Sequence, residues 1–501
     1  MTKKSEQSFL IGRSCGLLGK GNWYNREVRW QGMIKGEKGK QLSFFEINIE
    51  KYVPKEHLVR KLEKAIKWNE IRKIMSKYYS NKGRPGIDPV VLMKMVMVNY
   101  IFGIHSMRKT EEEIQVNLAY RWFLGLGIED KVPDHSTFAK NYERRFAGTE
   151  VFEEIFNYIL SECVKENYVK LSNVYIDSTH IKAHANKNKS KKVMVKLETL
   201  KYQEELEKEI NEVRKQHNQK ELKFKEEVSE KEISISLNDE QCGLFYKSER
   251  EKSFAYTAST ACDDNGFVLG TYVDSGNKHD SRTFYGIYNK VNEKYEEEIE
   301  KVVVDAGYKT PAIAKEIIDN NQEPVMPYKR PMTKEGNMKK YEYVYDSYYD
   351  CYICPNECLL EYSTTNKEGY KIYRGKEKDC SICPYKEKCT SMKAKIVTRH
   401  IWEDYLDIVE ELRHDLDNRE IYKQRSKTIE RVFADLKERH NHRYTRYKGK
   451  EKVQSDMNLV FACMNLKKLA NWLARNREYR DRSVDLVANI DELLLLSHHF
   501  S

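Results

Sequence analysis

The stretch VYIDSTHIKAHANK, residues 174–187, places an aspartate at the end of an apolar run and follows it with polar and basic residues. Val174 to Ile176 predict the interior of a β-strand, because β-branched and aromatic residues favour strands. A carboxylate at the end of such a strand is costly to bury unless it is paired or binds a metal. Asp177 is therefore either a functional acid at a strand end or an ordinary turn or helix-capping residue.

A second aspartate has the same kind of setting. Asp305 ends the run KVVVD (301–305), whose continuous apolar residues are typical of a strand buried on both faces. Gly307 then permits a tight exit from the strand. Because sites in open α/β sheets form where strands end, Asp177 and Asp305 are predicted to meet on adjacent strands.

Strands alternate with helices around these two acids. Residues 254–276 contain two strand-like runs joined at Asp-Asp-Asn-Gly, which is a strong hairpin signal. Helical patterns follow at 280–297 and 311–320. This alternation predicts an α/β domain.

A basic segment with interleaved tyrosines supplies a third candidate acid. Residues 421–450 contain ten Lys or Arg against three acids, a composition that favours binding to phosphate backbones. Glu430 borders an apolar stripe at helical spacing, and Lys437 follows it by seven residues. Glu430 is predicted either to bring a metal towards a phosphate or to pair with a nearby arginine on a solvated helix. The stripe consists of Ile429, Val432, Phe433 and Leu436.

Three blocks, YIDSTHIKAHANK, VVVDAGYKT and IERVFADLK, closely resemble the catalytic blocks of DDE-type bacterial insertion-sequence transposases. Other stretches resemble further parts of that family. They are the hairpin block, FAYTASTACDD followed by SGNKHDSRTF, and the N-terminal stretches GRPGIDPVVLMKM and PDHSTFAKNYERRF. The resemblance covers roughly residues 44–470. It implies an α/β fold with a ribonuclease H-like mixed-sheet core after an all-helical domain. It also implies a catalytic triad of Asp177, Asp305 and Glu430 that holds two Mg²⁺ (or Mn²⁺) ions.

The same resemblance implies the activity and the partner. Such an enzyme binds the terminal inverted repeats of its own element as double-stranded DNA, cleaves the ends and joins the 3′ ends to target DNA. Relatives often show Tyr, two residues, Arg, three residues, Glu, six residues, Lys, whereas four residues separate Arg425 from Glu430 here. Lys182 either lines the DNA side or is an ordinary surface residue. The DNA-binding candidates are Lys437, Arg425, Tyr422, Arg431, Arg439, Arg443, Arg446, Lys448 and Lys182.

Six cysteines lie between residues 351 and 389, and four of them form two C-x-x-C knuckles, a strong signal for structural zinc in a reducing compartment. Spacing alone favours Cys351, Cys354, Cys380 and Cys383. The resembling family usually retains the equivalents of Cys354, Cys380, Cys383 and Cys389, with Cys351 as the alternative fourth ligand. The remaining alternative is six thiols without a metal.

The composition bounds the partners and the location. The 501 residues are 33% charged with a net charge of +10, which is compatible with a polyanionic partner. The longest apolar stretch, 90–104, contains Lys94 and Asn99 and is too short to span a bilayer. A cytoplasmic, nucleoid-associated protein is expected, acting as a homodimer or higher oligomer because two DNA ends must be joined. The alternatives are another ribonuclease H-like DNA nuclease and a catalytically dead zinc-containing DNA-binding protein.

The sequence also predicts where each part begins and ends. Asp88 and Thr110 are predicted helix N-caps. The Lys/Glu-rich segment 188–240 has apolar residues at helical spacing, which predicts a helical hairpin or coiled coil. The predicted parts are a basic flexible arm (1–43), a helical DNA-binding or assembly domain (44–150), the catalytic core (151–187, 241–344 and 396–475), the Lys/Glu-rich helical insert (188–240), a cysteine-rich zinc insert (345–395) and a C-terminal helix (476–501).

Overall fold

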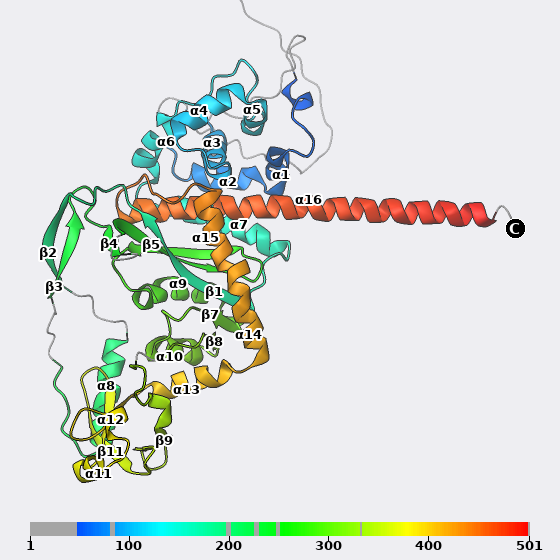
Figure 1. Cartoon of the computed structure of the whole chain (residues 1–501). Coiled ribbons are helices and arrows are strands. Elements are labelled where there is room, and N and C mark those ends of the chain that lie inside the picture. The colour runs from blue at the N-terminus through cyan, green and yellow to red at the C-terminus, as the bar shows by residue number, and fades with distance from the viewer. Residues whose placement is uncertain are drawn as a thin grey trace, which may run out of the picture.

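The computed structural model describes residues 48–80, 86–196, 202–224, 230–246, 251–330 and 333–498, and the predicted arm at 1–43 lies outside them. These residues form an N-terminal helical domain, a mixed sheet and a separate antiparallel sheet, arranged one below the other in Figure 1. Within the described ranges, every helix is too short or too polar to cross a membrane.

The N-terminal domain is a bundle of helices around α3, which is buried on nearly all sides. Asp88 caps α3 through a hydrogen bond from the backbone of Val90 (2.8 Å), as predicted. The predicted cap at Thr110 is wrong, because Ser106 caps α4 and Thr110 lies one turn inside it, bonded to Asn99 (2.8 Å). The elements are η1 Ile49–Lys51, α1 Leu58–Ala65, α2 Trp68–Ser76, α3 Pro89–Ile101, α4 Met107–Val116, α5 Leu118–Leu124, α6 Ser136–Asn141, the π-helical η2 Tyr142–Phe146 and α7 Val151–Lys165.

The mixed sheet confirms the predicted α/β character. Strand β1 pairs antiparallel with β5 and parallel with β7, and β7 pairs parallel with β8. The predicted hairpin forms, since β5 pairs antiparallel with β6 across a turn at 263–267, and β4 continues the same edge of β5. The strands are β1 Asn173–Lys182, β4 Gly243–Tyr246, β5 Lys252–Cys262, β6 Val268–Ser275, β7 Lys301–Val303 and β8 Glu323–Val325. Helix α9 (Asp280–Tyr295), followed by η3 Glu296–Glu298, packs on β5 and β6, and α10 (Pro311–Asp319) packs beside β8.

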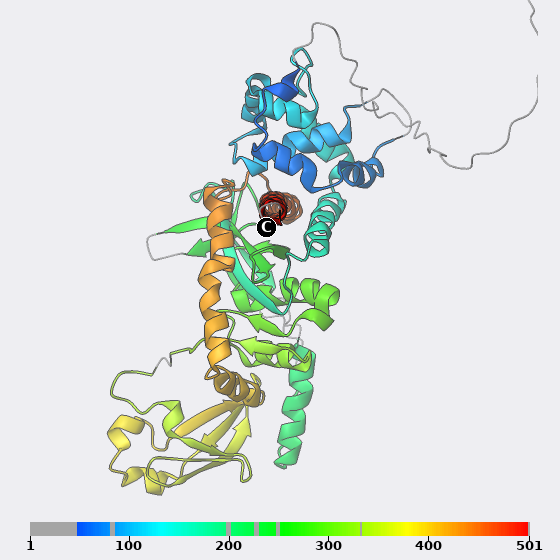
Figure 2. The same cartoon turned by 90° about the vertical axis from the view of Figure 1, so that its right-hand side faces the viewer.

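One long helix, α16 (Lys450–His498), joins the helical domain to the sheet. It lies between them and contacts α1, α3 and α7 on one side and β6 on the other (Figures 1 and 2). Its C-terminal part extends beyond both, at the red end of the chain in Figure 1. We expected a break near residue 476, but residues 450–498 contain no glycine or proline and the helix continues through that point.

A buried polar network fastens this junction. The Tyr100 hydroxyl on α3 donates to Asp456 Oδ1 on α16 (2.6 Å), and His442 Nε2 lies 3.3 Å from Asp456 Oδ2. The rings of Tyr100 and His442 stand 5.5 Å apart. Burial lowers the pKa of His442, but the charge and hydrogen bond of Asp456 outweigh it, so that this pKa lies above its ordinary value. A buried polar network of Tyr100, Asp456 and His442 therefore connects the helical domain to α16.

The prediction of a helical hairpin or coiled coil at 188–240 is wrong. The described part of this segment is an antiparallel ribbon of β2 (Ser190–Lys196) and β3 (Glu230–Ser236), with one helix, α8 (Gln203–Gln216), between them. Val193 pairs with Ile233 across the ribbon, so the apolar residues at 193 and 195 follow a period of two rather than the helical spacing that we assigned.

The cysteine-rich segment forms a five-stranded antiparallel sheet of its own, shown at the bottom of Figure 1. Helix α8 packs against β11 of this sheet, and Arg214 Nη1 donates to Thr364 Oγ1 and Thr365 O (both 2.8 Å). Its small core consists of Tyr343, Tyr352, Leu360, Tyr373 and Val397. The elements are η4 Lys340–Glu342, β9 Val344–Asp346, β10 Cys351–Ile353, β11 Leu359–Thr365, β12 Tyr370–Arg374, α11 Glu377–Ser381, α12 Lys386–Cys389 and β13 Ile396–His400.

The chain then returns to the mixed sheet through a series of helices. These are α13 Glu403–Leu412, α14 Leu416–Lys423, η5 Gln424–Lys427 and α15 Ile429–Glu438. Helix α15 packs on β1, so the residues of the third predicted block lie beside the strand that carries the first acid.

Candidate active site

Asp177 and Asp305 lie at equivalent positions on adjacent parallel strands. The register pairs Tyr175 of β1 with Val303 of β7, and each aspartate follows two residues later along its chain. β1 continues past Asp177 to Lys182 along β5, so the prediction that Asp177 ends its strand is wrong, whereas Asp305 follows the end of β7 by two residues. The two acids come together where the pairing of β1 with β7 ends.

Arg425 is the cation beside Asp177. Its Nη2 donates to Asp177 Oδ2 (2.7 Å), and the backbone of Ser178 donates to Oδ1 (2.8 Å). Burial raises the pKa of Asp177 to about 6, against the opposing effect of Arg425, and the charge of Asp305 adds to the rise. Arg425 itself is 7% exposed, and its Nε has no hydrogen-bond acceptor. The Arg425 guanidinium therefore pairs with Asp177 while its Nε donor has no hydrogen-bond acceptor.

A further acid, Asp280, was missed in the sequence. It is the first residue of α9, and its Oδ2 lies 3.8 Å from the point where a Cβ on Gly307 would stand, while Asp305 Oδ1 lies 3.0 Å from that point. Burial raises the pKa of Asp280, and the charge of Asp305 raises it further. The signal was in the quoted block SGNKHDSRTF, where an aspartate begins a helical pattern, but such a residue is usually a helix-start residue.

Glu430 is placed differently from the two aspartates. It is exposed in the first turn of α15, whose apolar stripe at Ile429, Val432, Phe433 and Leu436 is buried. Among the residues that the structure describes, the three predicted acids do not form a group whose carboxylate oxygens all lie within 4.8 Å of one another. Asp177 and Asp305 lie near each other, whereas the Glu430 carboxylate does not join them in a close group.

Most of the basic candidates lie on α15 or in the segment that follows it, which contacts Lys182 of β1. The backbone of Lys182 donates to Arg443 O (3.1 Å), the backbone of Thr445 donates to Lys182 O (2.9 Å), and Lys182 Nζ lies 5.6 Å from the centre of the Tyr444 ring. Tyr422 is half-buried, with its hydroxyl 3.3 Å from Arg425 Nη1. Lys437 is also half-buried, on α15. The exposed candidates are Arg431, Arg439, Arg443, Arg446 and Lys448.

The acids at the sheet edge fit a hard divalent cation by their chemistry. Asp177, Asp305 and Asp280 offer carboxylate oxygens, the donors that Mg²⁺ and Mn²⁺ prefer. Arg425 is the side-chain cation bonded within this group, and its Nε remains without an acceptor. Asp177 and Asp305 are the residues that would hold the metal, since each follows the paired residues Tyr175 and Val303 by two positions.

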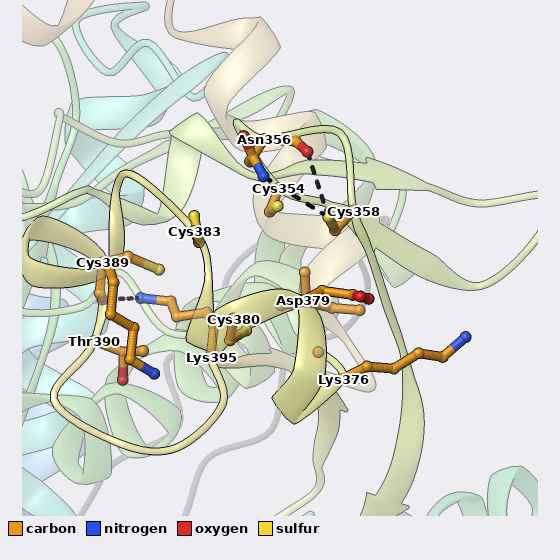
Figure 3. A pocket seen from close by; sticks show the side chains of 13 residues that line it. Cys354, Asn356, Cys358, Lys376, Asp379, Cys380, Cys383, Cys389, Thr390 and Lys395 are labelled. Atoms are coloured by element: carbon orange, nitrogen blue, oxygen red, sulfur yellow. Dashed lines mark hydrogen bonds between the residues drawn. The ribbon is translucent and has the colours of Figure 1, made fainter.

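The cysteine-rich segment brings five thiols around one small cavity (Figure 3). Its volume is about 30 Å³, enough for one ion or water molecule. Cys351 is instead buried in β10, away from the cavity lining. No three of the five Sγ atoms lie within 4.8 Å of one another, so the thiols are not gathered as closely as tetrahedral zinc requires. The five are Cys354, Cys358, Cys380, Cys383 and Cys389.

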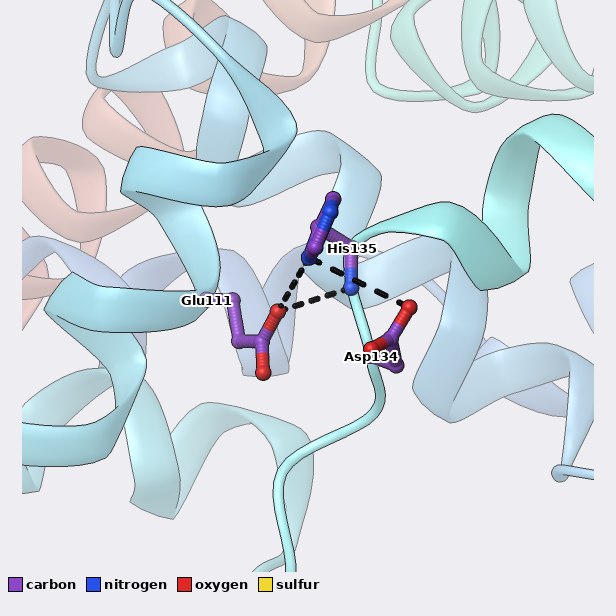
Figure 4. Close-up of side chains that lie close together, drawn as sticks. All are labelled: Glu111, Asp134 and His135. Carbon is purple, nitrogen blue, oxygen red and sulfur yellow. Dashed lines mark hydrogen bonds and ion pairs between the residues drawn. The ribbon is translucent and has the colours of Figure 1, made fainter.

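Glu111, Asp134 and His135 form the one close trio of potential metal ligands within the described ranges (Figure 4). Glu111 Oε2 lies 2.8 Å from both the backbone nitrogen and Nδ1 of His135. Asp134 accepts hydrogen bonds from the backbone and the hydroxyl of Ser136 at the start of α6. These contacts tie α4 to α6 and satisfy the trio internally, so we assign it a structural role in the helical domain.

Two models of known protein families match separate parts of the chain. A family model described as "Transposase domain (DUF772)" matches residues 47–144, and one described as "Transposase DDE domain" matches residues 353–470. These two matches support an insertion-sequence DDE transposase. No curated protein matches it at a significant level.

The two matched ranges cover different parts of the chain. The first covers the helical domain, and the second covers the cysteine-lined cavity, Glu430, Lys437 and the basic segment. Asp177 and Asp305 lie outside both ranges, so their assignment depends on the strand geometry and on the resemblance of their sequence blocks.

Proposed function

We propose that this transposase binds the terminal inverted repeats of its own element, cleaves the DNA there and joins the 3′ ends to target DNA. The observation that carries the proposal is the pair of aspartates at matching positions on β1 and β7, in a chain that carries a DDE transposase domain. The order of the mixed sheet, antiparallel on one side of β1 and parallel on the other, supports a ribonuclease H-like core.

In this proposal Asp177, Asp305 and Glu430 hold two divalent cations, most naturally Mg²⁺. Divalent cations held by these residues would supply the positive charge that activates the attacking oxygen and stabilises the leaving 3′ oxygen. Because carboxylates placed close together repel one another, the site favours the binding of cations. Arg425 holds Asp177 in its ionised form and fixes its orientation.

DNA binding in the proposal depends on basic residues of α15 and of the segment that follows it. Arg431 on α15 is exposed, as are Arg439, Arg443, Arg446 and Lys448 after it, and arginine and lysine neutralise phosphates with a strong dependence on salt. Lys437 lies on α15 seven residues after Glu430, on the same side of the helix, where it contacts phosphate close to the acids. Two protein copies bring the two DNA ends together.

The proposal is tested by an excision assay. A marker flanked by the DNA ends that border the gene is supplied with wild-type protein, Asp305→Asn or the control Asp319→Asn, which changes an α10 acid that pairs with Lys315. We expect excision with wild type and the control and none with Asp305→Asn, because the asparagine can still accept the hydrogen bond from Gly307 but loses the charge.

Other outcomes separate the alternatives. Equal excision by Asp305→Asn and wild type would contradict the catalytic assignment. Cleavage at the ends without joining to target DNA would identify a nuclease. Binding of the ends by both proteins without cleavage would indicate a DNA-binding protein with an inactive core.

We also propose structural zinc in the cysteine-lined cavity, held by Cys354, Cys380, Cys383 and Cys389. Thiolates are the ligands that structural zinc favours, and all four residues line the cavity. Cys383→Ser is expected to lose the bound zinc, whereas Cys351→Ala is expected to retain about one zinc per chain because Cys351 is absent from the lining. Metal analysis of the purified proteins measures both. Zinc retained by Cys383→Ser and lost by Cys351→Ala would reverse the ligand assignment.

A further inference from the structure

Asp280 has a carboxylate with no local partner. It is half-buried in the first turn of α9, and within the described part of the chain its side chain forms no hydrogen bond and no ion pair. Asp274, six residues earlier, is instead bonded to Lys278 and Lys450. A partly desolvated carboxylate normally has such a partner. The exception at Asp280 calls for a physical reason.

The surroundings of Asp280 direct it towards the proposed metal site. The ring of Phe284, one turn along α9, packs 5.9 Å from that of Tyr308, and the Tyr308 hydroxyl shares a hydrogen bond of 2.7 Å with Ser178 Oγ on β1. These contacts fix the start of α9 against the loop that carries Asp305. Oxygens of Asp280 and Asp305 consequently lie within 4 Å of a single point beside Gly307.

The charges in this region do not balance. Asp177, Asp305 and Asp280 contribute three carboxylates, and among the described residues Arg425 is the one side-chain cation bonded to any of them. The N-terminus of α9 adds a partial positive charge of about half a unit, which favours one acid there by roughly 0.3–1 kcal/mol. That contribution is too small to compensate two neighbouring carboxylates. A divalent cation would compensate them.

We propose that Asp280 is a further acid of the metal site, which holds a divalent cation together with Asp305. This inference rests on the proposed function, because it assigns Asp280 to the same cations. Gly307 keeps the space beside the two carboxylates open, since a side chain there would stand 3.0 Å from Asp305 Oδ1. Helix α9 thereby contributes a ligand to a site otherwise formed by β1, the loop after β7 and α15.

The test measures metal binding by the full-length protein without DNA. Mn²⁺ is titrated calorimetrically into wild type, Asp280→Asn, Asp305→Asn and Asp417→Asn. Asp417 is the matched control, because it too is the acid in the first turn of a helix and it pairs with Lys301. We expect Asp280→Asn to weaken Mn²⁺ binding about tenfold or more, Asp305→Asn to weaken it at least as much, and Asp417→Asn to leave it unchanged.

Thermal unfolding without metal shows whether each variant is folded. Asp280→Asn should unfold at the wild-type temperature or higher, because repulsion with Asp305 is removed. If it unfolds lower, Asp280→Ser replaces it, since serine also suits a helix start. Wild-type Mn²⁺ affinity in the Asp280 variant, with weakened affinity in Asp305→Asn, would overturn the inference and leave the proposed function standing. Failure of wild type to bind Mn²⁺ would overturn both.

Discussion

Glu430→Gln is expected to reduce DNA cleavage at the element ends by about 1,000-fold, the equivalent of about 4 kcal/mol of transition-state stabilisation. The same variant should unfold at the wild-type temperature. Glu430 is exposed at the start of α15, and its side chain forms no hydrogen bond or ion pair with the described residues. Removing its charge therefore costs little in folding, as for other exposed positions. A large loss of activity in a normally folded variant would place Glu430 at the metals when DNA is bound.

The matched control is Glu438→Gln, at the other end of the same helix. Glu438 is also exposed, but it pairs with Arg443. We expect this variant to cleave DNA within about twofold of wild type, because surface ion pairs contribute at most about 1 kcal/mol. Cleavage of labelled end fragments in Mg²⁺ measures both variants. Near-normal cleavage by Glu430→Gln would remove Glu430 from the triad and leave Asp177 and Asp305 as the metal ligands, together with the proposed Asp280.

Asp456→Leu is expected to lower the free energy of unfolding by about 3–5 kcal/mol, because it leaves the other members of a buried ionic network without a partner. Asp456 accepts the Tyr100 hydroxyl and faces His442, and all three side chains are buried at the junction of α3 and α16. Urea-induced unfolding measures the change. The control is Asp435→Asn, a partly exposed acid that pairs with Arg439 on α15, which should cost less than about 1 kcal/mol.

The pH dependence of this loss follows from His442. Its pKa in the folded protein lies above the unfolded value of about 6.5, since Asp456 outweighs the effect of burial. The stabilisation is therefore fully present below pH 6.5 and declines as pH rises through the folded pKa. The cost of Asp456→Leu should be larger at pH 6 than at pH 9. An equal cost at both pH values would show that the histidine is not charged in the folded protein.

The sequence predicted the elements whose patterns are local. The apolar runs before Asp177 and Asp305 become β1 and β7, and the turn at 263–267 joins the predicted hairpin. These signals need only neighbouring residues, because a buried parallel strand and a tight turn each have a distinctive composition.

The errors arose where the structure depends on distant contacts. Val193 belongs to a strand because Ile233 lies opposite it, some 40 residues away in the chain. Its spacing to later leucines suggested a helix, and helical spacing in a short polar segment is weak evidence when a partner strand is available. Thr110 has the spacing of a capping box, but Ser106 begins the helix earlier and Thr110 bonds to Asn99 instead.

The candidate site followed the same rule: its local sequence patterns were predicted, and its contacts between distant residues were not. Asp177 and Asp305 were found because each follows an apolar run, although β1 continues past Asp177 to Lys182, and Arg425 was suspected only as a DNA-binding residue. Its hydrogen bond to Asp177 joins residues 248 positions apart, which no local pattern reveals. Asp280 was missed for the same reason, since its neighbour Asp305 is brought to it by the packing of α9 against the sheet.

Helix α16 has a consequence for how the protein is made. It follows both the helical domain and the mixed sheet in the chain, yet α1, α3 and α7 pack on it from one side and β6 from the other. Domains commonly fold in order as synthesis proceeds, but here neither the helical domain nor the sheet can complete its core until residues up to about 470 have emerged, since Val453, Met457 and Leu466 are fully buried between them. Folding of both parts therefore depends on synthesis of α16 up to about residue 470, and products interrupted before that point should lack activity.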